Sequence, residues 1–145
     1  MFTHLLIATD GSEVAARAES TGLALAKRLG ARVTVVTATE PWSAMTNGEA
    51  MAFDFPIEEY EKATAQQARG VLANVRDAAA KLGVHCETAH ALDFPAEAII
   101  ETAKAKTCDL IVMASHGRRG MKRLLLGSQA QRVVTLSSLP VLICR

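Results

Sequence analysis

Residues 110–128 have the sequence LIVMASHGRRGMKRLLLGS, which combines three features of a ligand-binding α/β unit. The unbroken apolar run at residues 110–113 is typical of a strand buried in a parallel sheet. Small residues follow at 114–117, and they let a ligand approach the backbone closely. Gly127 and Ser128 then open a helical pattern, for which Ser128 is the expected N-cap. Because a helix N-terminus attracts anions, the stretch predicts a phosphate site.

The loop between this strand and this helix is basic. Its four cationic residues are Arg118, Arg119, Lys122 and Arg123. Charged loops are usually solvated, so charge alone assigns a ligand contact to none of them. The alternative is an ordinary connection, since the chain has neither GxGxxG nor GKS or GKT. We favour phosphate binding because the small strand end, the basic loop and the capped helix occur together.

Outward from this stretch, strand patterns and helix patterns alternate along the chain. Strand patterns cover residues 4–8, 32–38, 85–92, 110–114 and 140–144. Helical patterns cover residues 13–29 and 57–82, a segment from Pro95 with Asp93 as a possible cap, and a segment from Ser128. This strict alternation of five strands and four helices predicts one α/β domain, an open parallel sheet with helices on both faces. The long connection, residues 39–56, is interpreted as a lid or partner surface, or as a segment folded back on the core.

Composition excludes several classes of protein. Of the 145 residues half are apolar, and 16 basic residues against 15 acidic ones give a net charge of +1. A dedicated nucleic-acid binder would show a larger basic excess, so no nucleic-acid partner is expected. No apolar run approaches the roughly 18 residues of a membrane span, so no membrane partner is expected either. The three cysteines form no disulfide framework, which favours reduced thiols and a cytoplasmic protein.

Three motifs carry a resemblance to a known family. The first strand runs into Thr9-Asp10-Gly11-Ser12, the fourth into Ala114-Ser115-His116-Gly117, and nine residues later comes Gly127-Ser128. The pattern is similar to Gly, two residues, Gly, nine residues, Gly and Ser or Thr of the universal stress protein family, with Ala114 in place of the first glycine. The resemblance covers the whole chain, residues 1–145, as one universal stress protein domain. Ala114 is compatible with the motif where its φ is negative and obstructs it where φ must be positive.

The resemblance implies a Rossmann-like fold, similar to the adenine nucleotide alpha hydrolases, with strand order 3-2-1-4-5. It also implies a homodimer and, in the branch with the glycine motif, a bound adenine nucleotide, ATP or AMP. Ligands of such sheets bind where the strand order reverses, here between the first and fourth strands. The expected nucleotide-binding residues are Ala8, Thr9, Asp10, Ala38, Met113, Ala114, Ser115, His116, Gly117, Arg118, Arg119, Gly127, Ser128, Gln129 and Ala130.

Within this site several roles are expected of individual residues. Asp10 accepts ribose hydroxyl groups or holds a Mg²⁺ ion shared with the phosphates, the alternative being a turn residue before a helix. Ala38 lines the base pocket. His116 is either a loop histidine or a phosphate donor. A side chain at position 127 is expected to fill the phosphate position.

The predicted function is that of a cytosolic stress-response protein that binds an adenine nucleotide and acts by changing state or partner. No residue is assigned a catalytic role, since no general base is placed beyond Asp10 or His116. Two alternatives remain open, a slow ATPase and a dimeric scaffold without nucleotide. The apolar C-terminal strand, Val141–Cys144, is expected at the edge of the sheet, where it pairs with its own copy in a homodimer.

Overall fold

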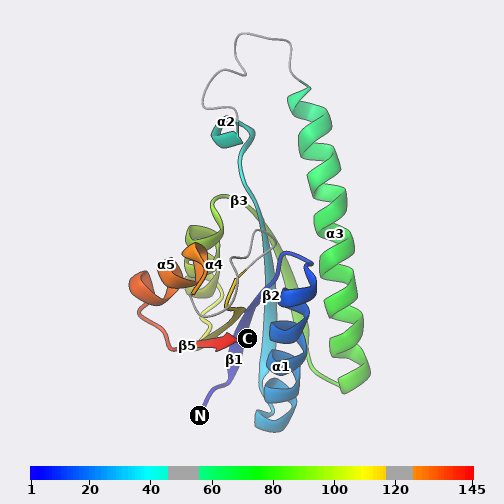
Figure 1. Cartoon of the computed structure of the whole chain (residues 1–145). Helices are drawn as coiled ribbons and strands as arrows, with labels where there is room; N and C mark the ends of the chain where they lie inside the picture. The colour runs from blue at the N-terminus through cyan, green and yellow to red at the C-terminus, as the bar shows by residue number, and fades with distance from the viewer. Residues whose placement is uncertain (46–55, 117–125) are drawn as a thin grey trace.

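The computed structural model describes residues 1–45, 56–116 and 126–145. Its five strands are β1 (His4–Ala8), β2 (Arg32–Thr39), β3 (Cys86–Leu92), β4 (Leu110–Ala114) and β5 (Val141–Cys144). All pair in parallel, in the order β3-β2-β1-β4-β5 (Figure 1). The predicted fold class and strand order are confirmed.

Helices cover both faces of this sheet, as predicted. The helices α1 (Glu13–Leu29) and α3 (Ile57–Leu82) lie on one face, and α4 (Pro95–Ala105) and α5 (Ser128–Leu136) lie on the other (Figure 1). Successive strand residues point to opposite faces. Leu5 and Ile7 therefore pack with α1 and α3, whereas Leu6 packs with α4 and α5. Packing on both faces holds the carboxyl ends of the strands together at one end of the sheet.

A fifth helix interrupts the expected alternation. The short helix α2 (Trp42–Met45) lies in the long connection after β2, so two helices separate β2 from β3. The ring of Trp42 packs against that of Tyr60 at 4.8 Å between centroids, and the Tyr60 hydroxyl donates to the Glu40 carbonyl at 2.7 Å. These contacts tie the start of α3 to the end of β2. This part of the connection thus packs back on the domain, while residues 46–55 lie outside the described part.

Most helix and strand ends follow local sequence signals. Gly30 and Gly83 end α1 and α3 in left-handed conformations, with φ of 65° and 71°. The N-cap of α4 is Phe94 rather than Asp93, although Pro95 holds the predicted first position. The N-cap of α5 is Gly127 rather than Ser128. The third strand begins at Cys86, one residue later than predicted, although the carbonyl of residue 85 still accepts a ladder bond from Val33.

Among the described residues, no helix combines the length and the apolar character needed to cross a membrane.

Candidate functional site

The central strands part at the carboxyl edge of the sheet. The ladder between β1 and β4 ends at the pair Ile7–Val112. The flanking ladders continue further, to Ala8–Val36 on one side and Ala114–Cys144 on the other. The strand order reverses between β1 and β4, which is where ligands of open α/β sheets bind. The structure therefore places the expected site at a point where the two strands no longer bond to each other.

The start of α5 is fastened directly to the end of β4. The Gly127 amide donates to the Ser115 carbonyl at 2.7 Å, and the Ser115 amide donates to the Cys144 carbonyl at 2.8 Å. A Cβ at position 127 would lie 3.0 Å from both the Ser115 carbonyl oxygen and the His116 Cα. Glycine is therefore favoured here, because a Cβ would be crowded by the backbone of the segment after β4. The prediction that a side chain would fill the phosphate position gave a different reason from the one the structure supplies.

The first turn of α5 presents backbone donors at this edge. Gly127 has φ −58° and makes no side-chain cap hydrogen bond, so the N-cap expected at Ser128 is wrong by one residue. Ser128 is instead the first residue of the helix and is exposed. The first amides of a helix have no carbonyl partner within that helix. With the positive end of the helix dipole, they form a donor-rich group suited to an anion.

Two predicted residues of this turn contribute to packing through their side chains. The Gln129 Oε1 accepts a hydrogen bond from the Ala96 amide at 3.1 Å, at the start of α4. Arg132, one turn later, forms an ion pair with Glu97. Ala130 is buried against the sheet. The side chain of Gln129 therefore holds α5 against α4, and a ligand here would meet the backbone of this turn.

The loop after β1 is rich in acceptors. The Thr9 amide donates to the Val36 carbonyl at 3.0 Å, which ties the loop to β2. The Ser12 amide donates to Asp10 Oδ1 at 2.9 Å, and the Gly11 amide donates to the Thr9 hydroxyl at 3.1 Å. Both of these loop amides are thus engaged inside the loop. The group that the loop brings to the edge of the sheet is the Asp10 carboxylate.

Three further predicted residues are buried in the strands. Ala8 and Met113 belong to the core beneath α4 and α5, and Ala114 belongs to the core beneath α1. Ala114 pairs with Cys144 inside the ladder, and among the described non-glycine residues only Thr107 has a positive φ. The methyl group that replaces the first motif glycine therefore meets no backbone conformation that would exclude it.

Ser115 and His116 follow directly from β4. The Ser115 Oγ and His116 Nδ1 lie 3.1 Å apart, and Ser115 is buried while His116 is partly exposed. Gly117, Arg118 and Arg119, together with Lys122 and Arg123, lie outside the described residues. Their assignment to the phosphate site stays a prediction.

A polar contact that the sequence did not indicate lies next to Ala38, near the end of β2. The Thr39 hydroxyl lies 2.7 Å from His90 Nε2, which joins β2 to β3 just beyond the half-buried Ala38. Burial lowers the pKa of His90 below its usual value, so its ring is neutral at pH 7.

A second contact that the sequence analysis did not predict joins Thr9 to Glu19 of α1. The sequence feature that could have indicated this contact is Glu19 itself, a charged residue on an otherwise apolar stripe of the helix.

The described residues include no group of three or more His, Cys, Asp or Glu side chains that could hold a metal ion. A Mg²⁺ ion at Asp10 would have one protein carboxylate and would need nucleotide phosphates and water as its other ligands.

Comparison with known proteins agrees with this architecture. The model of the universal stress protein family matches residues 1–145. The chain is 40% identical over 146 residues to a universal stress protein of Thermus aquaticus, and 35% identical over 149 residues to the universal stress protein YxiE of Bacillus subtilis. Both alignments cover all of each chain.

Solved structures share the fold over nearly the whole length. The hypothetical protein MJ0577 superposes with a TM-score of 0.84 at 24% identity, covering 99% of this chain and 95% of that one. A universal stress protein in complex with cAMP superposes with a TM-score of 0.72 at 25% identity, covering 99% and 97%.

Proposed function

Because the chain belongs to the universal stress protein family, we propose that it binds an adenine nucleotide where β1 and β4 part. The observation that carries this proposal is the bond from the Gly127 amide to the Ser115 carbonyl at 2.7 Å. It sets the N-terminus of α5 beside the end of β4, at the reversal of strand order. The relative solved with cAMP supports an adenine nucleotide as the ligand class.

The polarity of the two sides gives the ligand a direction. The start of α5 offers amide donors, which suit the phosphates. The loop after β1 offers the Asp10 carboxylate, which suits the ribose hydroxyl groups as donors. Ala38, at the end of β2, adjoins the loop side and suits the base. The nucleotide would thus span from β2 across β1 to the start of α5.

We propose that the protein acts through its bound state rather than by turnover. Phosphoryl transfer depends mainly on positioning and on stabilisation of charge in the transition state. Asp10 engages the Ser12 amide, and His116 lies beside Ser115. Neither contact orients a water molecule for attack. Phosphate release under saturating Mg-ATP is therefore expected far below about one per second, the lower end of common enzyme rates.

The test of nucleotide binding has two steps. Mass spectrometry of small molecules released from undialysed protein identifies a resident ligand. Calorimetric titration with ATP, AMP, cAMP and GTP then compares wild type with Asp10→Ala and Asp93→Ala. Asp93 is the matched control, because it follows β3 as Asp10 follows β1 and likewise accepts a loop amide, that of Phe94.

We expect Asp10→Ala to weaken adenine nucleotide binding about tenfold or more, the size of one hydrogen bond to a charged group. Asp93→Ala should bind the nucleotide as wild type does, because β3 is an outer strand of the sheet and is not next to β1 or β4. If no adenine nucleotide binds to wild type, the proposal is wrong and the scaffold alternative stands. ATP turnover near one per second that Asp10→Ala or His116→Ala abolishes would establish an enzyme instead.

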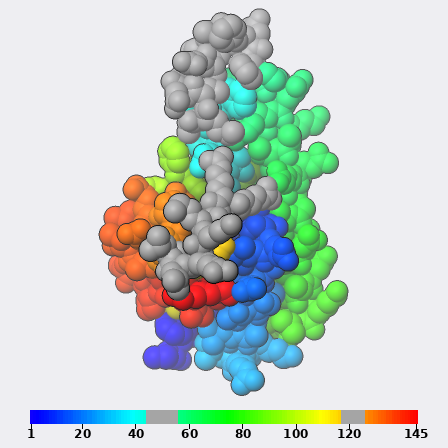
Figure 2. Space-filling view, in the orientation of Figure 1, coloured from blue at the N-terminus to red at the C-terminus, as the bar shows by residue number. Residues whose placement is uncertain are grey.

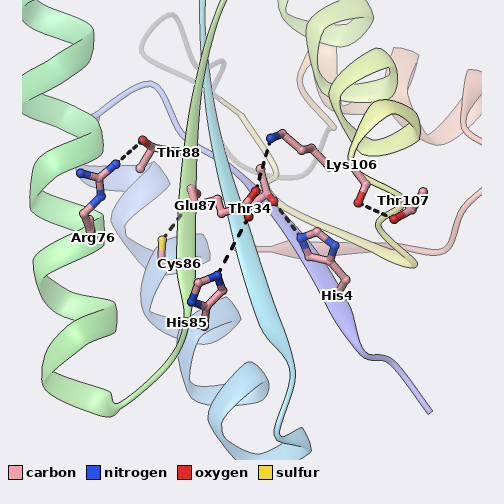
Figure 3. Close-up of polar contacts among 9 residues, drawn as sticks. All are labelled: His4, Thr34, Arg76, His85, Cys86, Glu87, Thr88, Lys106 and Thr107. Carbon is pink, nitrogen blue, oxygen red and sulfur yellow. Dashed lines mark hydrogen bonds and ion pairs between the residues drawn. The ribbon is translucent and has the colours of Figure 1, made fainter.

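We also propose a homodimer formed through β5. The two edges of the sheet differ in character. Edge strand β3 carries Glu87, which pairs with Lys106 at 3.3 Å, and Thr88, which accepts from Arg76 at 2.7 Å (Figure 3). Edge strand β5 has the sequence VLIC and no charged residue. Charged edges resist pairing with other chains, whereas an apolar edge favours it.

A further inference from the structure

Glu19 is a carboxylate on the side of α1 that faces the sheet. The buried residues of this helix are Ala15, Ala18, Gly22, Leu23 and Ala26. Glu19 falls at the same three- and four-residue spacing and is half-buried. A charged group on such a stripe is unfavourable unless it has a partner. Departures from a local pattern of this kind concentrate at functional positions.

The partner of Glu19 is Thr9, the residue that directly follows β1. The Thr9 hydroxyl donates to Glu19 Oε1. An ionised carboxylate only accepts hydrogen bonds, so the single hydroxyl proton of Thr9 points toward α1. The lone pairs of the same oxygen then accept the Gly11 amide at 3.1 Å. The result is a directed chain of hydrogen bonds from Gly11 through Thr9 to Glu19.

This chain holds the loop that carries Asp10. Gly11 adopts φ +76°, a conformation that only glycine occupies without strain. The bond from its amide to Thr9 holds this turn, and the next amide, that of Ser12, donates to Asp10 Oδ1 at 2.9 Å. Without Glu19 the Thr9 hydroxyl is free to rotate and donate elsewhere. Gly11 and Asp10 would then lose this link to α1 and would be held to the helix through the Ser12 cap, whose hydroxyl accepts from the Ala15 amide at 3.2 Å.

We propose that Glu19 is a positioning residue of the nucleotide site, which acts through Thr9 to present Asp10 to the ribose. This inference rests on the proposed function and adds a residue that makes no contact with the ligand. Its specific consequence is that Glu19 matters only for the part of the nucleotide that Asp10 recognises. That part is the ribose, whose hydroxyl groups would donate hydrogen bonds to the Asp10 carboxylate.

The experiment titrates ATP and 2′,3′-dideoxy-ATP into wild type, Glu19→Ala, Glu19→Gln and Thr9→Val. Asp77→Asn, on the exposed side of α3, is the matched control for the loss of one negative charge. Glu19→Ala and Thr9→Val should each weaken ATP binding about tenfold. The double variant that combines them should bind no more weakly than either single variant, since both substitutions break the same chain of hydrogen bonds. Glu19→Gln keeps an acceptor for the Thr9 hydroxyl and should stay within about twofold of wild type.

The dideoxy nucleotide separates positioning from general damage. Wild type and Glu19→Ala should bind it equally, because it lacks the hydroxyl groups that Asp10 accepts. An equal loss for both nucleotides, or unchanged ATP binding by Glu19→Ala, overturns the inference while leaving the proposed function intact. Failure of wild type to bind any adenine nucleotide overturns the proposed function, and this inference with it.

Discussion

His4 is a single buried side chain whose protonation couples the fold to pH. It lies at the start of β1 with its Nε2 atom 2.8 Å from the Thr34 hydroxyl, and it is 4% exposed (Figure 3). Burial and the nearby Arg32 lower its pKa below the usual 6.5, and the carboxylates of Glu87 and Asp109 oppose this only in part. The neutral ring is therefore the form that the folded protein prefers.

Acid should destabilise the protein through His4, starting below the usual pKa of 6.5. Below pH 6.5 the unfolded chain takes up a proton that the folded chain resists, so the free energy of unfolding falls as the pH falls. Each such group contributes at most about 1.4 kcal/mol per pH unit. Urea denaturation between pH 7.5 and pH 5 should show this slope in wild type and a flatter slope in His4→Gln.

His90 contributes a slope of the same sign, because burial lowers its pKa as well, so His90→Gln measures that second contribution separately. The pKa values of Glu87, Glu97 and Asp109 are also lowered, from 4.5, 4.5 and 3.8. Their stabilisation is present above those values and is lost only at lower pH. An unchanged slope in His4→Gln would show that His4 is not the titrating group.

Helix α1 approaches the sheet through residues with small side chains. A Cβ at Gly22 would lie 2.6 Å from Ile7 Cδ1 and 2.8 Å from Ile7 Cγ1. Ile7 is fully buried, so its side chain has little room to move. The sequence pattern marks position 22 as a helix interior, where alanine is ordinarily the better residue. The packing of α1 on β1 reverses that preference.

Gly22→Ala should therefore lower the free energy of unfolding by about 1–2 kcal/mol, because overpacking outweighs the gain in helix propensity. Gly70→Ala is the matched control, in an exposed position of α3 where a Cβ meets nothing within 4 Å. That variant should gain up to about 1 kcal/mol. In an Ile7→Val background, which removes the Cδ1 atom but keeps a carbon at the Cγ1 position, the loss from Gly22→Ala should be smaller without disappearing. A stabilised Gly22→Ala single variant would contradict the packing argument.

The assembly of the whole molecule depends on which edge of the sheet stays open. β5 lies at the surface between α5 and α1 (Figure 2). The Pro140 carbonyl accepts from the Ile111 amide of β4, and the Cys144 carbonyl accepts from the Ser115 amide just after β4. Backbone groups of alternate residues point to opposite neighbours. Those of Val141 and Ile143 therefore face the open edge, where a second copy would pair across a two-fold axis.

Val141→Pro should convert the dimer to a monomer in light scattering. Proline removes one outward amide, keeps an apolar side chain of similar size, and leaves the bonds to β4 in place. Val141→Ala is the control, because it loses more of the side chain but keeps the amide, and it should remain a dimer. A wild type of monomer mass at micromolar concentration would refute the proposed assembly.

Sequence periodicity determined the elements of this protein because it is a local property. Apolar runs located β1 and β4, and Gly30, Gly83 and Pro95 marked helix ends within a residue. The alternation of strands and helices then determined the parallel sheet and the layers of helices. The expectation failed where a short helix, α2, forms in a segment with no clear period, and where a cap shifted from Ser128 to Gly127.

The sequence predicted where in the fold the candidate site should lie, but not the contacts between its residues. The residues after β1 and β4 were expected together because parallel strands end at one edge. Only the tertiary structure showed why glycine is favoured at position 127, since the atoms that would crowd a Cβ belong to Ser115 and His116. It likewise decided that Glu19 reaches Thr9 and that Gln129 holds α4. Such contacts join residues distant in sequence, and their geometry depends on how closely helices pack on the sheet, which no local pattern records.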